Sequence, residues 1–148
     1  MLSRSLIISI ILCATATLAH SQTVQLITAA EAKLPNATSH GASRAITRGP
    51  GIKVVSPDPA MKSIRTPFDF KIVFEPRGGA KIDPSSATIT YLKNPAVDLT
   101  ERLKSGIRPD GLHIHGATAP AGEHQIRISV KDNDGRQTSE VFSLNVVD

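Results

Sequence analysis

The strongest pattern in this chain is an alternation of apolar and polar residues between positions 68 and 75. Every second residue from Phe68 to Phe74 is phenylalanine or isoleucine, and most residues between them are polar. Successive side chains of a β-strand point to opposite faces of its sheet, so this period of two places the large apolar side chains on one face. The segment is therefore predicted to be a strand with one buried face, ended by the turn residues Pro76-Arg77-Gly78-Gly79.

Shorter stretches of the same kind follow one another from residue 50 to the last residue, with turn residues between them. None of the intervening stretches is long enough for the helix that would join two parallel strands, so an α/β architecture is excluded. Residues 97–104 are ambiguous between a short strand and a helical turn in a cross-over loop. The other strands are predicted at 52–55, 87–93, 112–115, 125–131 and 141–147.

Asp132-Asn133-Asp134-Gly135 is a strong turn signal between the last two of these strands. Asn and Gly tolerate the positive φ angles of tight hairpin turns, so the two strands are predicted to form a hairpin. The same residues resemble half of a calcium-binding loop, but the third ligand and the glutamate that completes such a loop are missing. A hairpin turn is therefore the expected structure.

About seven strands at these intervals predict an all-β domain, an immunoglobulin-like antiparallel β-sandwich over residues 50–148. Residues 120–124 and 130–136, followed by the alternating C-terminal strand, resemble bacterial immunoglobulin-like or fibronectin type III-like modules. That resemblance implies the fold and says little about function. The chain has no tryptophan and one cysteine, so the disulfide and tryptophan of an antibody-type core are excluded.

Residues 1–21 are predicted to be a secretory signal peptide. Arg4 precedes an apolar run from Leu6 to Ala14, and small residues then lead to a cleavage site after Ser21 or, alternatively, after Ala19. This apolar run is too short for a stable membrane span. It contains the only cysteine, Cys13, so the exported chain is expected to be cysteine-free and to be periplasmic or secreted.

Residues 22–49 are predicted to be a flexible lead-in to the sandwich. Residues 28–34 could form one or two helical turns, which Pro35 would stop. The residues that follow, 36–44, are small and polar and offer little apolar surface to bury. Removal of residues 22–48 is therefore expected to leave the stability of the sandwich nearly unchanged.

The charge of the chain is modest and mixed. The formal net charge is +4, and it becomes +3 when Arg4 is lost with the signal peptide. Basic residues are scattered among acidic ones, and aromatic residues are few. Nucleic-acid binding needs a basic stripe or a platform of stacking aromatic side chains, so we expect no nucleic-acid partner.

His113 and His115 are the first candidates for a metal site. Residues two apart in a strand share a face, so both imidazoles could hold one ion while Leu112 and Ile114 face the core. His124 could join them if its strand pairs with theirs. Two exposed histidines without a metal are the alternative interpretation of the same pattern.

A second metal hypothesis concerns copper. Cleavage after Ala19 would leave His20 as the first residue, and an N-terminal histidine can bind copper through its amine and its ring. The arrangement of residues 55–76 is similar to that of the small periplasmic copper-carrier sandwiches. The chain departs from them in having Asp134-Gly135-Arg136 where they carry Asp-Gly-His, and in having Met61 as its single methionine after the signal peptide.

No catalytic motif is recognisable, because the nucleophile-elbow, P-loop, dinucleotide-binding and zinc-protease patterns are all missing from the sequence. The chain is therefore expected to be a non-enzymatic module without a cofactor that binds or supports another envelope or extracellular protein. Sandwich domains do this through loop ends or an exposed strand edge. A periplasmic carrier of copper or another metal, with histidine ligands, is the alternative function.

Overall fold

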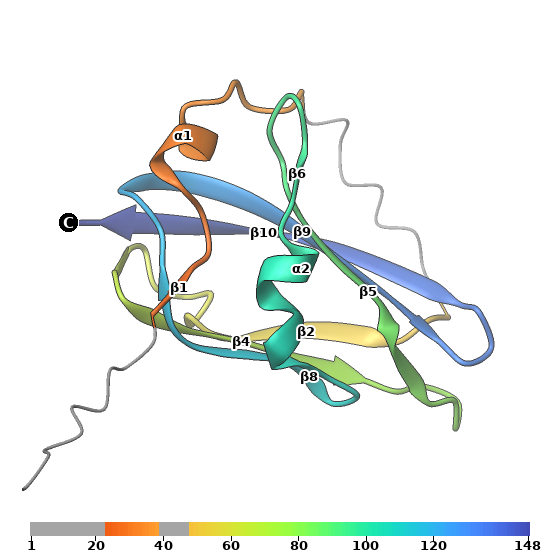
Figure 1. Cartoon of the computed structure of the whole chain (residues 1–148). Helices are drawn as coiled ribbons and strands as arrows, with labels where there is room; N and C mark the ends of the chain where they lie inside the picture. Colours follow the sequence, from red (N-terminus) through yellow and green to blue (C-terminus); the bar gives the residue numbers. More distant parts are fainter. Residues whose placement is uncertain (1–22, 39–47) are drawn as a thin grey trace, which may run out of the picture.

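The computed structural model describes residues 23–38 and 48–148, which form two packed β-sheets (Figure 1). The first sheet has the order β1 (Val24–Gln25), β8 (Gly111–Thr118), β4 (Phe68–Glu75), β2 (Gly51–Ser56), with β7 (Ile107–Arg108) also paired to β8. The second has the order β3 (Ile64–Arg65), β10 (Gln137–Val147), β9 (Gly122–Asp132), β5 (Ile82–Tyr91), β6 (Val97–Asp98). The helical elements of the described residues are α1 (Ala29–Ala32), α2 (Thr100–Leu103) and the 3-10 turn η1 (Lys104–Gly106).

The strand order is that of an immunoglobulin-like sandwich. Strands β2, β4, β8 and β7 stand in the A-B-E-D order of one immunoglobulin sheet, and β10, β9 and β5 stand in the G-F-C order of the other. These neighbours pair antiparallel, whereas the two-residue strands β1 and β3 pair parallel with β8 and β10. The predicted fold class is therefore confirmed.

The core lies between the two sheets and is made by the alternating residues of their long strands. Phe70, Ile72 and Phe74 of β4 are buried, and so are Ile126 and Ile128 of β9 on the facing sheet. The period of two that marks Phe68–Glu75 as a strand therefore also assigns its buried face correctly. Burial of each large apolar side chain stabilises the fold by roughly 2 kcal/mol.

One strand begins earlier than the sequence predicts. Residues 82–86, which precede the predicted strand 87–93, belong to β5, where the register with β9 shifts between Asp83 and Thr88. The ambiguous residues 97–104 contain both candidate structures, a short strand (β6) followed by one helical turn (α2). The hairpin between β9 and β10 is confirmed, with Gly135 at a φ of 77° in its turn.

Part of the lead-in that was expected to be flexible is packed against the sandwich. In this N-terminal segment, defined here as residues 23–38, Leu26 is fully buried and Ile27 nearly so. Val24 pairs with Ala117 of β8, and the Leu26 amide donates a hydrogen bond to the Thr118 carbonyl at 2.8 Å. The expectation of a flexible lead-in is therefore wrong for residues 23–38, and the burial of Leu26 and Ile27 predicts that their removal destabilises the sandwich. Residues 39–47 lie outside the described part of the chain.

Hydrogen bonds join the same segment to α2 and to the loop that follows β5. The Arg102 guanidinium binds the Glu31 carboxylate through two hydrogen bonds of 2.8 and 3.0 Å, and it also donates to the Leu26 carbonyl at 2.9 Å. The Lys93 ammonium donates to the Ala32 carbonyl at 3.1 Å and to the Asn36 side-chain oxygen at 2.6 Å. These bonds hold α1 in place although the helix has a single turn.

The Arg102 hydrogen bonds also change the acidity of Glu31. They lower the pKa of the Glu31 carboxyl from 4.5 to about 2, against the opposing effect of desolvation, and hydrogen bonds from Thr28 add to the lowering. Thr28 caps α1 through a reciprocal pair of bonds with Glu31. Glu31 therefore takes part both in the N-terminal cap of α1 and in the ion pair with Arg102.

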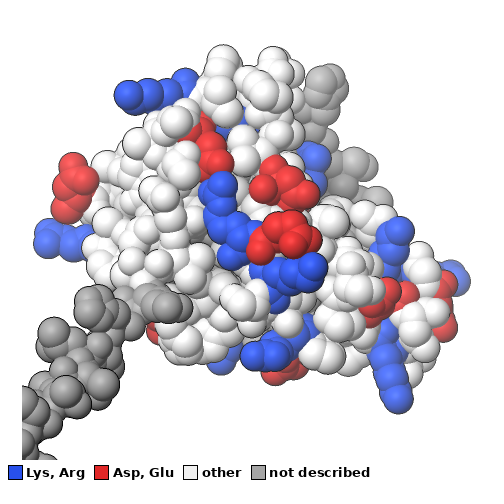
Figure 2. Space-filling view, viewed as in Figure 1, with Lys and Arg blue, Asp and Glu red and all other residues white. Residues whose placement is uncertain are grey.

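Acidic and basic side chains are interspersed on the face of the molecule shown in Figure 2, including the region around α2. Two ion pairs lie there, the partly buried Glu31–Arg102 pair and the exposed Glu101–Lys104 pair. Within the described residues, no helix is long and apolar enough to cross a membrane.

Leu26→Ala should lower the free energy of unfolding by about 3 kcal/mol, because it removes a fully buried side chain and leaves a cavity. Urea denaturation measures the change. The same substitution at the half-buried Leu34 is the matched control and should cost less. An unchanged denaturation midpoint for Leu26→Ala would contradict the packing of the N-terminal segment.

Glu31→Gln should lower the free energy of unfolding by about 2 kcal/mol at pH 7, because it removes the charged acceptor of Arg102. The folded pKa of Glu31 is lowered, so its contribution is complete above about pH 4.5 and disappears as the pH falls toward 2. The stability difference between wild type and variant should therefore shrink over that interval. Glu101→Gln, which alters only an exposed pair, should change stability by less than about 0.5 kcal/mol at either pH.

Candidate functional site

The structure places His113 and His115 together on the solvent-facing side of β8. Leu112 and Ile114 point into the core, as the alternation predicts. The centroids of the two imidazole rings are 4.0 Å apart. The predicted pairing of the two rings is thus present in the folded chain.

Asp69 of the neighbouring strand β4 joins the pair. Its carboxylate oxygen lies 3.4 Å from Nδ1 of His115, and one ligand atom from each of Asp69, His113 and His115 lies within 4.8 Å of the others. We call these three residues the histidine–aspartate cluster. Sequence reasoning missed Asp69, because His115 of β8 lies 46 residues further along the chain.

A β-bulge brings the aspartate to the histidines. Phe68 pairs with Ala117 and Phe70 pairs with Ile114, so Asp69 alone faces two residues of β8, His115 and Gly116. Gly116 has a φ of 64°, which a glycine adopts at little cost. Its amide donates to the Asp69 carboxylate at 3.4 Å, which helps to orient that group toward His115.

A surface hollow of about 420 Å³ adjoins the cluster on β8. Its charged lining residues other than the histidines are Lys71, Arg108 and Asp110. The turn η1 approaches β8 closely here, since a Cβ on Gly106 would lie 2.5 Å from the His113 carbonyl oxygen. The cluster is therefore open to solvent on a rigid part of the sheet.

His124 does not join the other two histidines. Its strand β9 belongs to the second sheet and pairs with β5 and β10, so the expected pairing with β8 does not occur. The side chain is only 2% exposed. Its Nε2 donates to the Pro120 carbonyl at 2.8 Å, which leaves Nδ1 to accept from the Tyr91 hydroxyl, also at 2.8 Å.

The Tyr91 hydroxyl remains a hydrogen-bond donor at ordinary pH. Burial raises the pKa of Tyr91 to about 12, and the negative charge of Glu31 adds to the rise. Both ring nitrogens of His124 are thus occupied by a buried hydrogen-bond network. His20, the remaining candidate ligand, lies outside the described residues.

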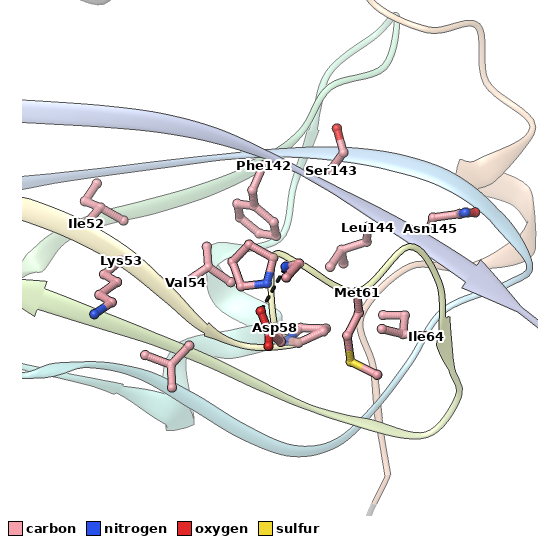
Figure 3. Close-up of a pocket in the computed structure, with 14 residues that line it drawn as sticks. Ile52, Lys53, Val54, Asp58, Met61, Ile64, Phe142, Ser143, Leu144 and Asn145 are labelled. Atoms are coloured by element: carbon pink, nitrogen blue, oxygen red, sulfur yellow. Dashed lines mark hydrogen bonds between the residues drawn. The ribbon is translucent and has the colours of Figure 1, made fainter.

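A second candidate site is a groove along the side of the sandwich between β2 of the first sheet and β10 of the second. The groove has a volume of about 720 Å³ and a mostly apolar lining (Figure 3). We call it the edge groove. Its main lining residues are Ile52, Val54 and Val55 of β2, Phe142 and Leu144 of β10, Met61 of the connection between β2 and β3, and Ile64 of β3.

The edge groove exists because no described strand lies between β2 and β10. Among the described residues, β2 pairs with β4 alone and β10 pairs with β3 only at Val146 and Val147, so no described strand pairs with residues 52–54 or 142–145 on the side of the groove. Gly49 closes one end, since its backbone lies against Thr138 of β10.

The core is incompletely covered along this side. Ile52, Val54 and Phe142 pack against the core cluster but are only partly buried. Val55 and Met61 are 43% and 60% exposed, and no other large apolar side chain is as exposed among the described residues. The opposite side of the sandwich is closed, because the connection from β6 to β7 buries Leu99 and Leu103 there.

The hollow surface continues beyond Met61. A second depression of about 710 Å³ shares Val55, Met61 and Ile64 with the edge groove and extends to Phe68 and Val147. The two depressions adjoin at these shared residues, and we refer to them together as the trough.

No family model matches the chain, and no curated protein or solved structure is significantly similar to it.

Tyr91→Phe should lower the free energy of unfolding by about 1–2 kcal/mol, because it leaves Nδ1 of His124 buried without a donor. A double-mutant cycle with His124→Leu measures the coupling between the two side chains, which should exceed about 0.5 kcal/mol. Additive effects of the two substitutions would contradict the network.

Proposed function

We propose that this chain is an exported, non-enzymatic binding module that receives an extended segment of another envelope or extracellular protein in its edge groove. The observation that carries the proposal is the row of partly exposed core side chains between two free strand edges, Ile52 and Val54 on β2 and Phe142 on β10. A signal-like N-terminus supports export.

The chemistry of the groove favours an extended polypeptide as the occupant. Free strand edges offer unpaired backbone N–H and C=O groups, which an added strand satisfies with main-chain hydrogen bonds. The apolar side chains of each edge recur at every second residue, which matches the period of a strand laid beside them.

The shape of the groove supports the same occupant. Because Val55, Met61 and Ile64 line both depressions, the apolar surface extends over both of them and is not confined to one compact pocket. A small molecule is usually enclosed on most sides by its site. A strand with apolar residues at alternate positions would cover the trough along its length and complete the core.

The strand order also supports kinship with bacterial immunoglobulin-like or fibronectin type III-like modules, among which partner binding at a strand edge is common. The absence of recognisable catalytic motifs in the sequence is the basis for proposing a binding function rather than an enzymatic one.

Photo-cross-linking at position 55 or 61 tests the proposal, with p-benzoylphenylalanine introduced at one position at a time in cells that produce and export the chain. The same group at Val97, on the edge strand β6 of the other side, is the matched control. The cross-linked peptide of the partner is then sequenced and synthesised. We expect this peptide to bind the purified domain and to protect backbone amides of β2 or β10 from hydrogen exchange.

Val55→Glu should weaken binding of that peptide by about tenfold or more, because it places a charge in the apolar trough. Val97→Glu should leave binding unchanged, and thermal melting verifies that both variants are folded. Cross-links to a second copy of the chain, or to residues 39–47 of the same chain, would overturn the proposal, because they would show that a different segment occupies the groove. A folded domain that gives no cross-link from either position would overturn it as well.

A further inference from the structure

We propose that the histidine–aspartate cluster is a binding site for a divalent transition-metal ion of the zinc or copper type. The site is formed by Asp69 of β4 with His113 and His115 of β8. It lies on the solvent-facing side of the first sheet and does not depend on the proposed use of the edge groove.

The spacing of the donor atoms fits a single ion. One ligand atom from each of the three side chains lies within 4.8 Å of the other two. An ion held at about 2.0–2.2 Å from each nitrogen and oxygen needs its ligand atoms to be no more than about 4 Å apart, so small rotamer changes of exposed side chains complete the geometry. A tetrahedral ion would keep one position open for water or for a ligand from outside.

The backbone beneath the site is fixed. His113 and His115 belong to a strand whose alternate residues are buried in the core. The bulge at Gly116 sets Asp69 opposite His115, and the Asp69 carbonyl accepts a hydrogen bond of 2.7 Å from the Ser56 hydroxyl. Ligands on adjacent strands lose less conformational freedom on binding than ligands on loops do.

The ligand set selects the kind of metal. Two imidazoles and one carboxylate suit zinc, copper and nickel, whereas calcium and magnesium prefer oxygen ligands alone. The carboxylate offsets part of the positive charge of the ion. Lys71 and Arg108, which line the neighbouring hollow, oppose a cation but favour an anionic group as the ligand at the open position.

A metal-free explanation of the same geometry is an ion pair between protonated His115 and Asp69. The two explanations differ in whether zinc binds. The metal site predicts one zinc ion per chain, lost when any of its three ligands is removed, whereas an ion pair alone predicts no stoichiometric binding.

Isothermal titration of zinc chloride into the untagged, full-length exported chain tests the proposal, after mass spectrometry has established the first residue. We expect one zinc ion per chain at pH 7. His113→Ala, His115→Ala and Asp69→Asn should each weaken binding by about tenfold or more. Asp110→Asn, which changes an aspartate of the same hollow outside the cluster, is the matched control and should bind as wild type does.

Thermal melting provides a second readout, which distinguishes the loss of metal ligands from the loss of the folded structure. Zinc should raise the melting temperature of the wild type, because it binds the folded state, and it should not raise that of His113→Ala/His115→Ala. Absence of stoichiometric zinc binding to the folded wild type would overturn the proposal. So would binding that survives the double substitution, and removal of His20 would then show whether that residue is the ligand instead.

Discussion

In a sandwich of two β-sheets, the core reaches the surface along the open sides and ends between the sheets, here called its rims. The need to cover these rims determines where the short segments of this chain pack. The two sheets bury their facing side chains against each other, but the space between them remains open along both sides and at both ends. Here the connection between β6 and β7 closes one side with Leu99 and Leu103, and the N-terminal segment adds Leu26 and Ile27 to the core. The side between β2 and β10 is left as the edge groove, so the groove is the one long rim that the described residues do not seal.

The segments that cover the rims carry the polar network of the domain. Glu31 and Arg102 join the N-terminal segment to α2, and Lys93 joins it to the loop after β5. Since the sequence has a single cysteine, no disulfide within the chain can hold these segments together. Buried apolar side chains supply most of the stability, and the charged hydrogen bonds determine where short segments dock, because α1 and β1 are too short to be stable alone.

The sequence predicts the regular parts of this fold well and its irregular parts poorly, for a physical reason. A strand such as Phe68–Glu75 repeats its apolar residues over several periods, and the hairpin turn at Gly135 requires a particular backbone conformation, so both leave local signals. Leu26 and Ile27 are two adjacent apolar residues with no period to detect. Asp69 meets His115 because a bulge shifts the register of two strands that are distant in sequence. The pair His113–His115 was visible because the period of a strand alone brings the two rings together.

Both proposed sites therefore lie where the regular pairing of strands is interrupted. At the histidine–aspartate cluster, an extra residue in β8 turns a carboxylate toward two imidazoles. At the edge groove, no described strand covers the partly buried side chains of the core. Ser56 lies between them, because it ends β2 beside the trough and donates its hydroxyl proton to the Asp69 carbonyl. Ser56 of the first sheet therefore contacts both candidate sites, whereas the second sheet borders the edge groove alone.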